Sequence, residues 1–151
     1  MSRSKDIGTR AETAVVRYLQ ANGFPHAERR ALRGRQDAGD ITGTPGICWE
    51  VKARKRPISD ADVAAWLAET ETEAAAADAE IGVLVVRRAG VGEGNAGRWW
   101  AYLTAGAVTG LASEGGFVPY GQLGFPVRML LRDAVTLLHL AGYGTPDGGG
   151  S

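Results

Sequence analysis

Cysteine is nearly absent from this 151-residue chain, because Cys48 is the only one. A single thiol excludes an internal disulfide, and it excludes zinc or iron–sulfur sites built from several cysteines. Histidine is scarce as well: His26 and His139 stand alone, and neither belongs to a Ser-His-Asp or Cys-His pattern. We therefore expect a chain that suits a reducing compartment and has no thiol-based or histidine-based catalytic centre.

Long apolar runs are also missing. No segment approaches the roughly 20 residues that a helix needs to cross a bilayer, and no long apolar segment follows the N-terminal MSRSKDIGTR. We therefore expect no membrane span, no signal peptide and a cytoplasmic protein. The length is sufficient for one domain with a core of its own.

The chain also has no net charge, because acidic and basic residues are equal in number. The charges are nevertheless unevenly distributed. Residues 29–56 hold eight basic and three acidic side chains, whereas residues 60–80 hold seven acidic side chains and no basic one. A basic block with embedded acids favours a polyanionic substrate over a neutral one. The acidic run has the simpler interpretation of a solvated helix face.

Apolar spacing and turn residues indicate the order of the structural elements. Helices alternate with strands, which predicts one mixed α/β domain over residues 1–141, with a central mixed sheet flanked by helices. Residues 104–127 give no clear pattern, and residues 142–151 are predicted to form a disordered tail. The predicted elements are helices at 6–22, 59–78 and 132–140, a short strand near 27–32, hairpin arms at 40–42 and 47–53, and strands at 81–86 and 98–103.

One glycine motif is a weak signal. Residues 92–97 match the GxGxxG pattern of dinucleotide-binding loops, which require a following helix whose N-terminus faces the phosphates. Here a strand pattern follows, and Glu93 would repel phosphate. We therefore predict a hairpin loop and no nucleotide cofactor. In the strand after it, neighbouring side chains point to opposite faces, so at least one of Trp99 and Trp100 is expected in the core.

The second arm of the predicted hairpin carries charged residues within an apolar strand. Side chains alternate along a strand, so Trp49 and Val51 share one face while Glu50 and Lys52 share the other. Asp40 lies on the first arm and can approach Glu50. Two carboxylates held together repel each other unless a cation lies between them. Mg²⁺ suits this position, because it takes oxygen ligands and binds through one or two carboxylates together with phosphate.

Two further residues can complete such a site. A lysine beside a metal, here Lys52, can orient or help to deprotonate an attacking water, or neutralise charge on a phosphate. Glu12 lies beside the apolar stripe of the first helix and can act as a further ligand or support one. The simpler alternative is a solvated Glu–Lys pair with Asp40 as a turn residue. The charges and their spacing fit both interpretations.

The sequence resembles a known group of nucleases. The pattern Asp40…Glu50-x-Lys52 looks like the metal motif of the PD-(D/E)xK nuclease superfamily. The longer pattern GTRAETAVVRYLQANGF, then ERRALRGRQDAGDITG, then ICWEVKARKR resembles the archaeal-type Holliday junction resolvases and related bacteriophage-encoded enzymes. The resemblance covers about residues 6–56 well, extends to the acidic helix and the strand at 81–86 in their order only, and gains nothing from residues 104–151. It implies a restriction-endonuclease-like fold.

The resemblance also implies roles for individual residues. Asp40 and Glu50 correspond to the two metal-binding acids, Lys52 to the catalytic lysine, and Glu12 to a helical glutamate that supports the metal site. Val51 occupies the position whose main-chain carbonyl binds the metal in the family. The implied cofactor is Mg²⁺, which Mn²⁺ can replace.

The implied function is a Mg²⁺-dependent, structure-selective DNA endonuclease that resolves four-way junctions by metal-activated water hydrolysis of phosphodiesters. The expected partners are branched or duplex DNA and a second copy of the chain, since the family forms homodimers that nick opposed strands. A bacteriophage enzyme would work in the host cytoplasm. Phosphate contacts position DNA without reading its sequence, and they are expected from Arg29, Arg30, Arg33, Arg35, Arg54, Lys55 and Arg56.

Two departures from the family pattern leave alternatives open. Some resolvases carry a serine in the loop before the aspartate, where this chain offers only Gln36 or Asp37, and Asp37 is a further candidate acid beside the metal. Some superfamily members have a glutamine in the helix after the lysine, and residues 59–78 contain none. The alternatives are another nuclease of the same superfamily (an exonuclease, a nickase or a restriction-like enzyme) and a non-catalytic DNA-binding module.

Overall fold

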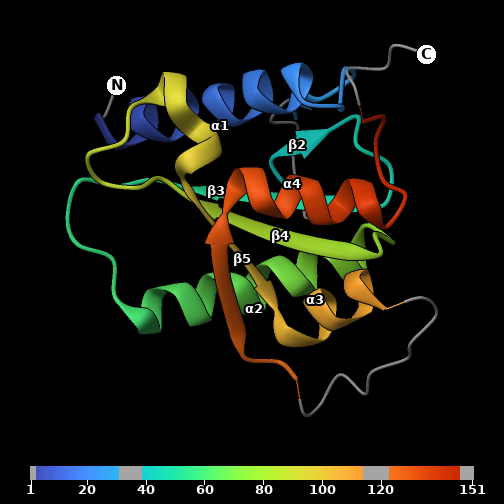
Figure 1. The fold of residues 1–151 in the computed structure, drawn as a ribbon. Coiled ribbons are helices and arrows are strands. Elements are labelled where there is room, and N and C mark those ends of the chain that lie inside the picture. The colour runs from blue at the N-terminus through green and yellow to red at the C-terminus, as the bar shows by residue number, and fades with distance from the viewer. Residues whose placement is uncertain (1–2, 31–38, 114–122, 147–151) are drawn as a thin grey trace.

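The computed structural model describes residues 3–30, 39–113 and 123–146. Figure 1 shows a sheet that lies between helices, so the predicted α/β class with a central mixed sheet flanked by helices is confirmed. The elements in chain order are α1 (Arg3–Ala21), β1 (Glu28–Arg29), β2 (Ile41–Thr42), β3 (Ile47–Lys52), α2 (Asp60–Ala76), β4 (Ile81–Val86), the 3₁₀ helix η1 (Glu93–Arg98), β5 (Trp100–Thr104), α3 (Ala105–Ala112), β6 (Pro126–Leu130) and α4 (Leu131–Leu140).

Within the described residues, six strands lie side by side in the order in which they occur in the sequence. Strands β3 and β4 are parallel, and every other neighbouring pair is antiparallel. A parallel pair needs a long crossover connection, which α2 provides. The predicted hairpin is confirmed as β2 and β3, with Ile41 opposite Trp49.

The two faces of the sheet bury different helices. Trp49 and Val51 of β3 belong to the main core, which includes residues of α1 and α4. Leu84 and Val86 of β4 point to the other face and pack against Val63 and Leu67 of α2. Figure 1 shows α1 above the sheet and α2 below it. The alternation in β3 therefore follows the prediction, and it directs Glu50 and Lys52 to the α2 side.

A capping box fixes the beginning of α2. The Ser59 hydroxyl accepts a hydrogen bond from the Asp62 amide at 3.1 Å, and the Asp62 carboxylate accepts one from the Ser59 amide at 2.9 Å. Together these bonds satisfy two backbone N–H groups at the helix end. Ser59 is thus the N-cap residue, and the helix begins at Asp60.

The glycine-rich part of the chain contains elements that the sequence pattern did not predict. Helix α3 lies within residues 104–127, and strand β6 begins within them at Pro126. Thr104 caps α3 by accepting a hydrogen bond from the Ala107 amide at 3.1 Å. The loop with the GxGxxG motif connects antiparallel strands β4 and β5, as predicted, and it contains η1. Trp99, between η1 and β5, is fully buried, and Trp100, the first residue of β5, is half-buried, so one of the two tryptophans lies in the core as predicted.

The predicted tail begins with residues that contact the domain. The Tyr143 hydroxyl donates to Glu80 at 3.1 Å, and the Thr145 amide donates to the Gly23 carbonyl at 2.7 Å. The rest of the predicted tail, residues 147–151, lies outside the described residues. Among the helices described, none has the length and apolar content that a membrane crossing needs.

Candidate functional site

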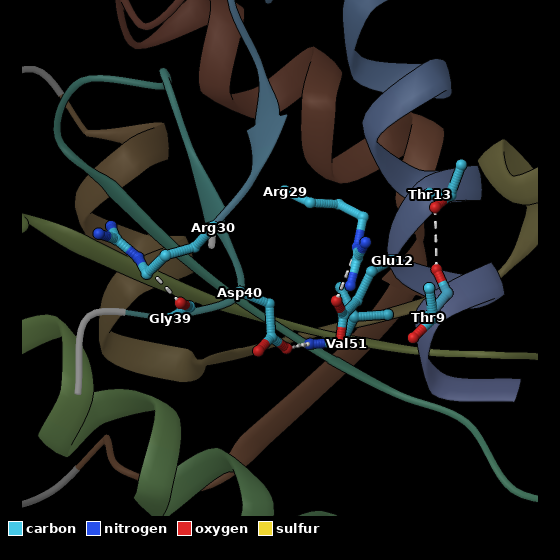
Figure 2. Close-up of polar contacts among 8 residues, drawn as sticks. All are labelled: Thr9, Glu12, Thr13, Arg29, Arg30, Gly39, Asp40 and Val51. Atoms are coloured by element: carbon cyan, nitrogen blue, oxygen red, sulfur yellow. Dashed lines mark hydrogen bonds and ion pairs between the residues drawn. The ribbon is translucent and has the colours of Figure 1, made fainter. Parts of the chain in front are cut away.

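Asp40 lies at the end of the β2–β3 ladder. Its amide donates to the Trp49 carbonyl at 2.7 Å, and its carboxylate accepts a hydrogen bond from the Val51 amide at 2.8 Å (Figure 2). Since Ile41 is opposite Trp49, Asp40 is opposite Glu50 in the same register. The hairpin thus brings the two predicted acids together from the two arms that flank its turn.

Glu50 is buried on the α2 side of the sheet, with 6% of its surface exposed. Burial raises the pKa of its carboxyl group to about 10, with contributions from a hydrogen bond to the Glu73 carboxyl group and from the negative charges of Asp40 and Glu73. The positive charge of Lys52 opposes this shift. Burial among other carboxyl groups thus favours the neutral form of Glu50.

Two acids of α2 join Glu50. Glu50, Glu69 and Glu73 each offer an oxygen atom, and these atoms lie within 4.8 Å of one another, so the three residues could hold a metal ion. The acidic run was expected to be a solvated helix face, so neither Glu69 nor Glu73 was among the predicted site residues. A signal was present: residues four apart lie on one side of a helix, and Glu73 precedes the buried Ala74.

Lys52 lies between the strand and the helix. Its Nζ atom is 3.5 Å from Glu50 Oε1 and 3.9 Å from Glu69 Oε1. The same atom is 5.9 Å from the centroid of the Trp66 ring, which favours a cation over its face. These contacts hold the ammonium group beside the buried carboxyl group of Glu50.

Glu12 reaches the site from α1. Arg29 Nε donates to Glu12 Oε1 at 3.1 Å (Figure 2). Burial and the negative charge of Asp40 raise the pKa of Glu12, while Arg29 and Lys52 oppose the shift. The Glu12 carboxyl group is therefore within electrostatic range of both Asp40 and Lys52.

The Val51 carbonyl is directed to the Asp40 side of β3. Backbone groups of successive strand residues face alternate neighbouring strands. Trp49 and Val51 both bond with Asp40, whereas the Lys52 carbonyl accepts from the Arg87 amide at 2.9 Å on the β4 side. The carbonyl of Val51 thus lies on the side of the strand where the hairpin places its aspartate.

The predicted DNA-binding residues have different environments. Arg29 is paired with Glu12, and Arg30 Nε donates to the Gly39 carbonyl at 3.1 Å (Figure 2). Arg54 forms an ion pair with Asp62 and lies 5.1 Å from the centroid of Trp66. The side chains of Lys55 and Arg56 are exposed. The predictions for Arg33, Arg35 and Asp37 lie outside the described residues.

The site as a whole has more acid than base. Glu12, Asp40 and the three glutamates of the β3–α2 cluster face Lys52 and Arg29, and the pKa of both Glu12 and Glu50 is raised. A divalent cation fits this donor set, because it offers oxygen-binding positive charge where carboxyl groups repel one another. The site can thus bind a metal beside a lysine.

Family models, curated proteins and solved structures were compared with this chain, and none of them matches it.

Proposed function

We propose that the protein is a Mg²⁺-dependent, structure-selective DNA endonuclease with a restriction-endonuclease-like fold, acting on four-way junctions. One observation carries the proposal: the hairpin places Asp40 opposite Glu50, with Lys52 Nζ 3.5 Å from the Glu50 carboxyl group. An acid pair with an adjacent lysine is the set that a metal-dependent phosphodiesterase needs. Lysine can neutralise developing charge on a phosphate while the acids hold the cation.

The cation would be held by Asp40 and Glu50, with the Val51 carbonyl on the same side of the strand. Asp40 keeps one carboxylate oxygen on the Val51 amide, so that hydrogen bond fixes the orientation of the other oxygen. Glu12 supports the site from α1, where Arg29 holds its carboxyl group. When bound, Mg²⁺ supplies positive charge that polarises a phosphate and lowers the pKa of a coordinated water. Mn²⁺ can take the same oxygen ligands.

The basic residues near the site would bind the sugar–phosphate backbone. Lys55 and Arg56 are exposed directly after β3 and have no ion-pair partner among the described residues. Contacts of this kind position DNA without reading its sequence. They favour an enzyme that selects the shape of its substrate. Opposed nicks in a junction require two such sites, hence a homodimer.

Cleavage assays test the proposal. A synthetic four-way junction, a linear duplex, a flap and a single strand are incubated with the protein in Mg²⁺, and initial rates are compared. We expect the junction to be cut fastest, and Asp40→Asn, Glu50→Gln and Lys52→Ala each to reduce its rate by roughly 10²-fold or more. Glu93→Gln, which neutralises an acid on η1, is the matched control and should cut like the wild type.

The outcomes separate the alternatives. Faster cleavage of a linear duplex or flap would show that the enzyme is a nuclease with that substrate and not a junction resolvase. Binding that is equal with and without Mg²⁺, with no cleavage of any substrate, would identify a non-catalytic DNA-binding module. Folded Asp40→Asn and Glu50→Gln variants that cleave at the wild-type rate would disprove the metal site itself.

A further inference from the structure

A second basic surface lies next to the candidate site, on the α2 side of the sheet. It is a groove of about 560 Å³, built from the segments that follow β3 and β4 and from strands β5 and β6. The function proposed above assigns no role to the parts contributed by β4, β5 and β6. The basic residues that line this groove are Arg54, Lys55, Arg56, Arg87, Arg88 and Arg128.

The positive charge of the groove is largely unneutralised. Asp60 is the acidic residue in its lining, and Arg54 is paired with Asp62. Within the described ranges, no carboxylate lies within ion-pair distance of Arg87, Arg88 or Arg128. Uncompensated arginines gathered in a groove create a positive potential that attracts a polyanion.

Trp100 holds two of these arginines in place. The Arg88 Cζ atom is 4.2 Å from the centroid of the Trp100 ring, and the Arg128 Cζ atom is 4.0 Å from it. Arg88 follows β4 and Arg128 belongs to β6, so the two guanidinium groups approach Trp100 from the strands on either side of β5. Stacking on the indole orients both groups. Arg88 Nη1 also donates to the Arg98 carbonyl at 3.3 Å, so the other N–H donors of Arg88 and those of Arg128 are left for another partner.

The groove adjoins the candidate site through β3 and the segment after it. The Arg87 amide donates to the Lys52 carbonyl at 2.9 Å, so the groove begins where β3 leaves Glu50 and Lys52. Arg54 lies in its lining and also stacks on Trp66, whose ring is 5.9 Å from Lys52 Nζ. A DNA strand that places a phosphate at Lys52 could therefore continue into the groove and remain beside basic side chains.

We propose that this groove binds the phosphodiester backbone of the DNA strand beyond the scissile phosphate, with Arg88 and Arg128 as phosphate contacts and Trp100 as the residue that positions them. The identity of the strand rests on the proposed nuclease function. Planar guanidinium forks bind phosphate and carboxylate oxygens in pairs. The position of the groove beside Lys52 and Arg54 favours a phosphodiester over an acidic protein segment. Trp100 is a positioning residue here, because guanidinium groups already occupy its ring.

Binding without cleavage tests the groove separately from the active site. The anisotropy of a labelled four-way junction is measured in EDTA, from 50 to 200 mM salt, with full-length protein. We expect Arg88→Gln/Arg128→Gln to raise Kd by about 10-fold or more and to reduce the slope of log K against log salt by about 1.8, since each phosphate contact contributes about 0.9. Arg17→Gln/Arg132→Gln removes the same charge from exposed positions on α1 and α4, and it should retain both values.

Two further variants test the role of Trp100 and the geometry. Trp100→Leu leaves the charge unchanged, and we expect it to raise Kd by about 3-fold to 10-fold, because the guanidinium groups lose their orientation. Arg88→Lys/Arg128→Lys should restore the salt slope but only part of the affinity. Thermal unfolding of every variant confirms that it is folded.

The outcomes distinguish this inference from the proposed function. If Arg88→Gln/Arg128→Gln binds DNA like the wild type, with the same salt slope, the groove inference is wrong even if Glu50→Gln abolishes cleavage. If the groove variants lose binding but no substrate is cleaved, the groove inference holds and the nuclease proposal fails. Competition by poly-glutamate, with DNA binding unaffected by the groove variants, would assign the groove to an acidic protein partner and overturn the inference.

Discussion

Single residues of the candidate site are held where ionisation is unfavourable. Burial, the Glu73 carboxyl group and the charge of Asp40 raise the pKa of Glu50 to about 10, and burial followed by the charge of Asp40 raises the pKa of Glu12. A bound cation would reverse both effects, because it favours the ionised carboxylates. Placing these acids together is therefore expected to destabilise the metal-free protein, and a bound metal is expected to remove that destabilisation.

The raised pKa of Glu50 predicts that the metal-free protein loses stability as pH rises. In the unfolded chain a glutamate titrates near 4.3, so between that pH and about 10 the folded state holds a proton that the unfolded state has released. The contribution of Glu50 to the free energy of unfolding is thus fully present below about pH 4.3. Above that pH it falls by up to about 1.4 kcal/mol per pH unit.

Urea unfolding in EDTA at pH 5.5 and pH 8.5 measures this effect. We expect a lower free energy of unfolding at pH 8.5, and a much smaller difference in Glu50→Gln. A weaker slope should remain, because the pKa of Glu12 and of Glu71 is also raised by burial. An unchanged slope in Glu50→Gln would show that this carboxyl group is ionised in the folded protein.

Two donor sets share Glu50, and a metal titration distinguishes them. If Asp40 and Glu50 hold the cation, Asp40→Asn should weaken Mn²⁺ binding at pH 7 by at least about 10-fold. Glu73→Gln should leave it equal or tighter, since losing the negative charge of Glu73 favours ionised Glu50. Isothermal titration calorimetry measures both. A loss of affinity in Glu73→Gln alone would assign the metal to Glu50, Glu69 and Glu73.

Residue-level prediction succeeded where a strand or a turn determined the geometry. Alternation along β3 placed Glu50 and Lys52 on one face, and the turn brought Asp40 opposite Glu50. Glu69 and Glu73 were missed, because their contact with Glu50 depends on how α2 packs across the sheet. Pattern analysis of a helix tells which face is apolar, but it does not tell which strand residue the flanking acids meet.

At the scale of elements, α2 connects the capping box to the candidate site. Asp62 accepts hydrogen bonds from the Ser59 amide and from Arg54, so one carboxylate joins the helix end to the segment after β3. The same helix carries Glu69 and Glu73 toward Glu50. Fraying at the N-terminus of α2 would therefore disturb both the segment after β3 and the helix that carries Glu69 and Glu73.

Removing the cap should destabilise the protein measurably. Ser59→Ala loses the hydrogen bond from the Asp62 amide, and we expect the free energy of unfolding to fall by about 1 kcal/mol. Thr72→Ala is the matched control, because it removes a hydroxyl from the exposed side of α2 and should change stability by no more than about 0.5 kcal/mol. Equal losses in both variants, measured by urea unfolding, would contradict a capping role for Ser59.

The elements that sequence patterns did not predict have little side-chain signal. Helix α3 has the sequence AGAVTGLA, in which small residues give no distinct apolar stripe and two glycines disfavour a helix. Its cap at Thr104 and its packing beside α4 stabilise it instead. Strand β6 follows from pairing with β5, which a local pattern does not reveal.

At the scale of the whole molecule, Cys48 can report on opening of the fold. Its side chain is 1% exposed, and burial together with the charges of Glu73 and Glu50 raises the pKa of its thiol to about 12. A thiol reagent reacts with the thiolate, so we expect native protein at pH 8 to be labelled only as fast as it opens. Labelling should accelerate with urea in parallel with unfolding, and rapid stoichiometric labelling without urea would show that the β3–α2 interface opens readily.

The strand order has a consequence for how the chain folds. Every strand pairs with its sequence neighbours, and the β2–β3 hairpin closes over residues 43–46 alone, a local contact of the kind that forms quickly. The parallel pair forms later, since its two strands meet only after the whole of α2 has been enclosed between them. A chain that has formed the first hairpin already holds Asp40 beside Glu50, whereas Glu69 and Glu73 arrive when α2 docks. We therefore expect the acidic site to be completed in the slowest step of folding, and a cation that binds it to act late, by slowing unfolding.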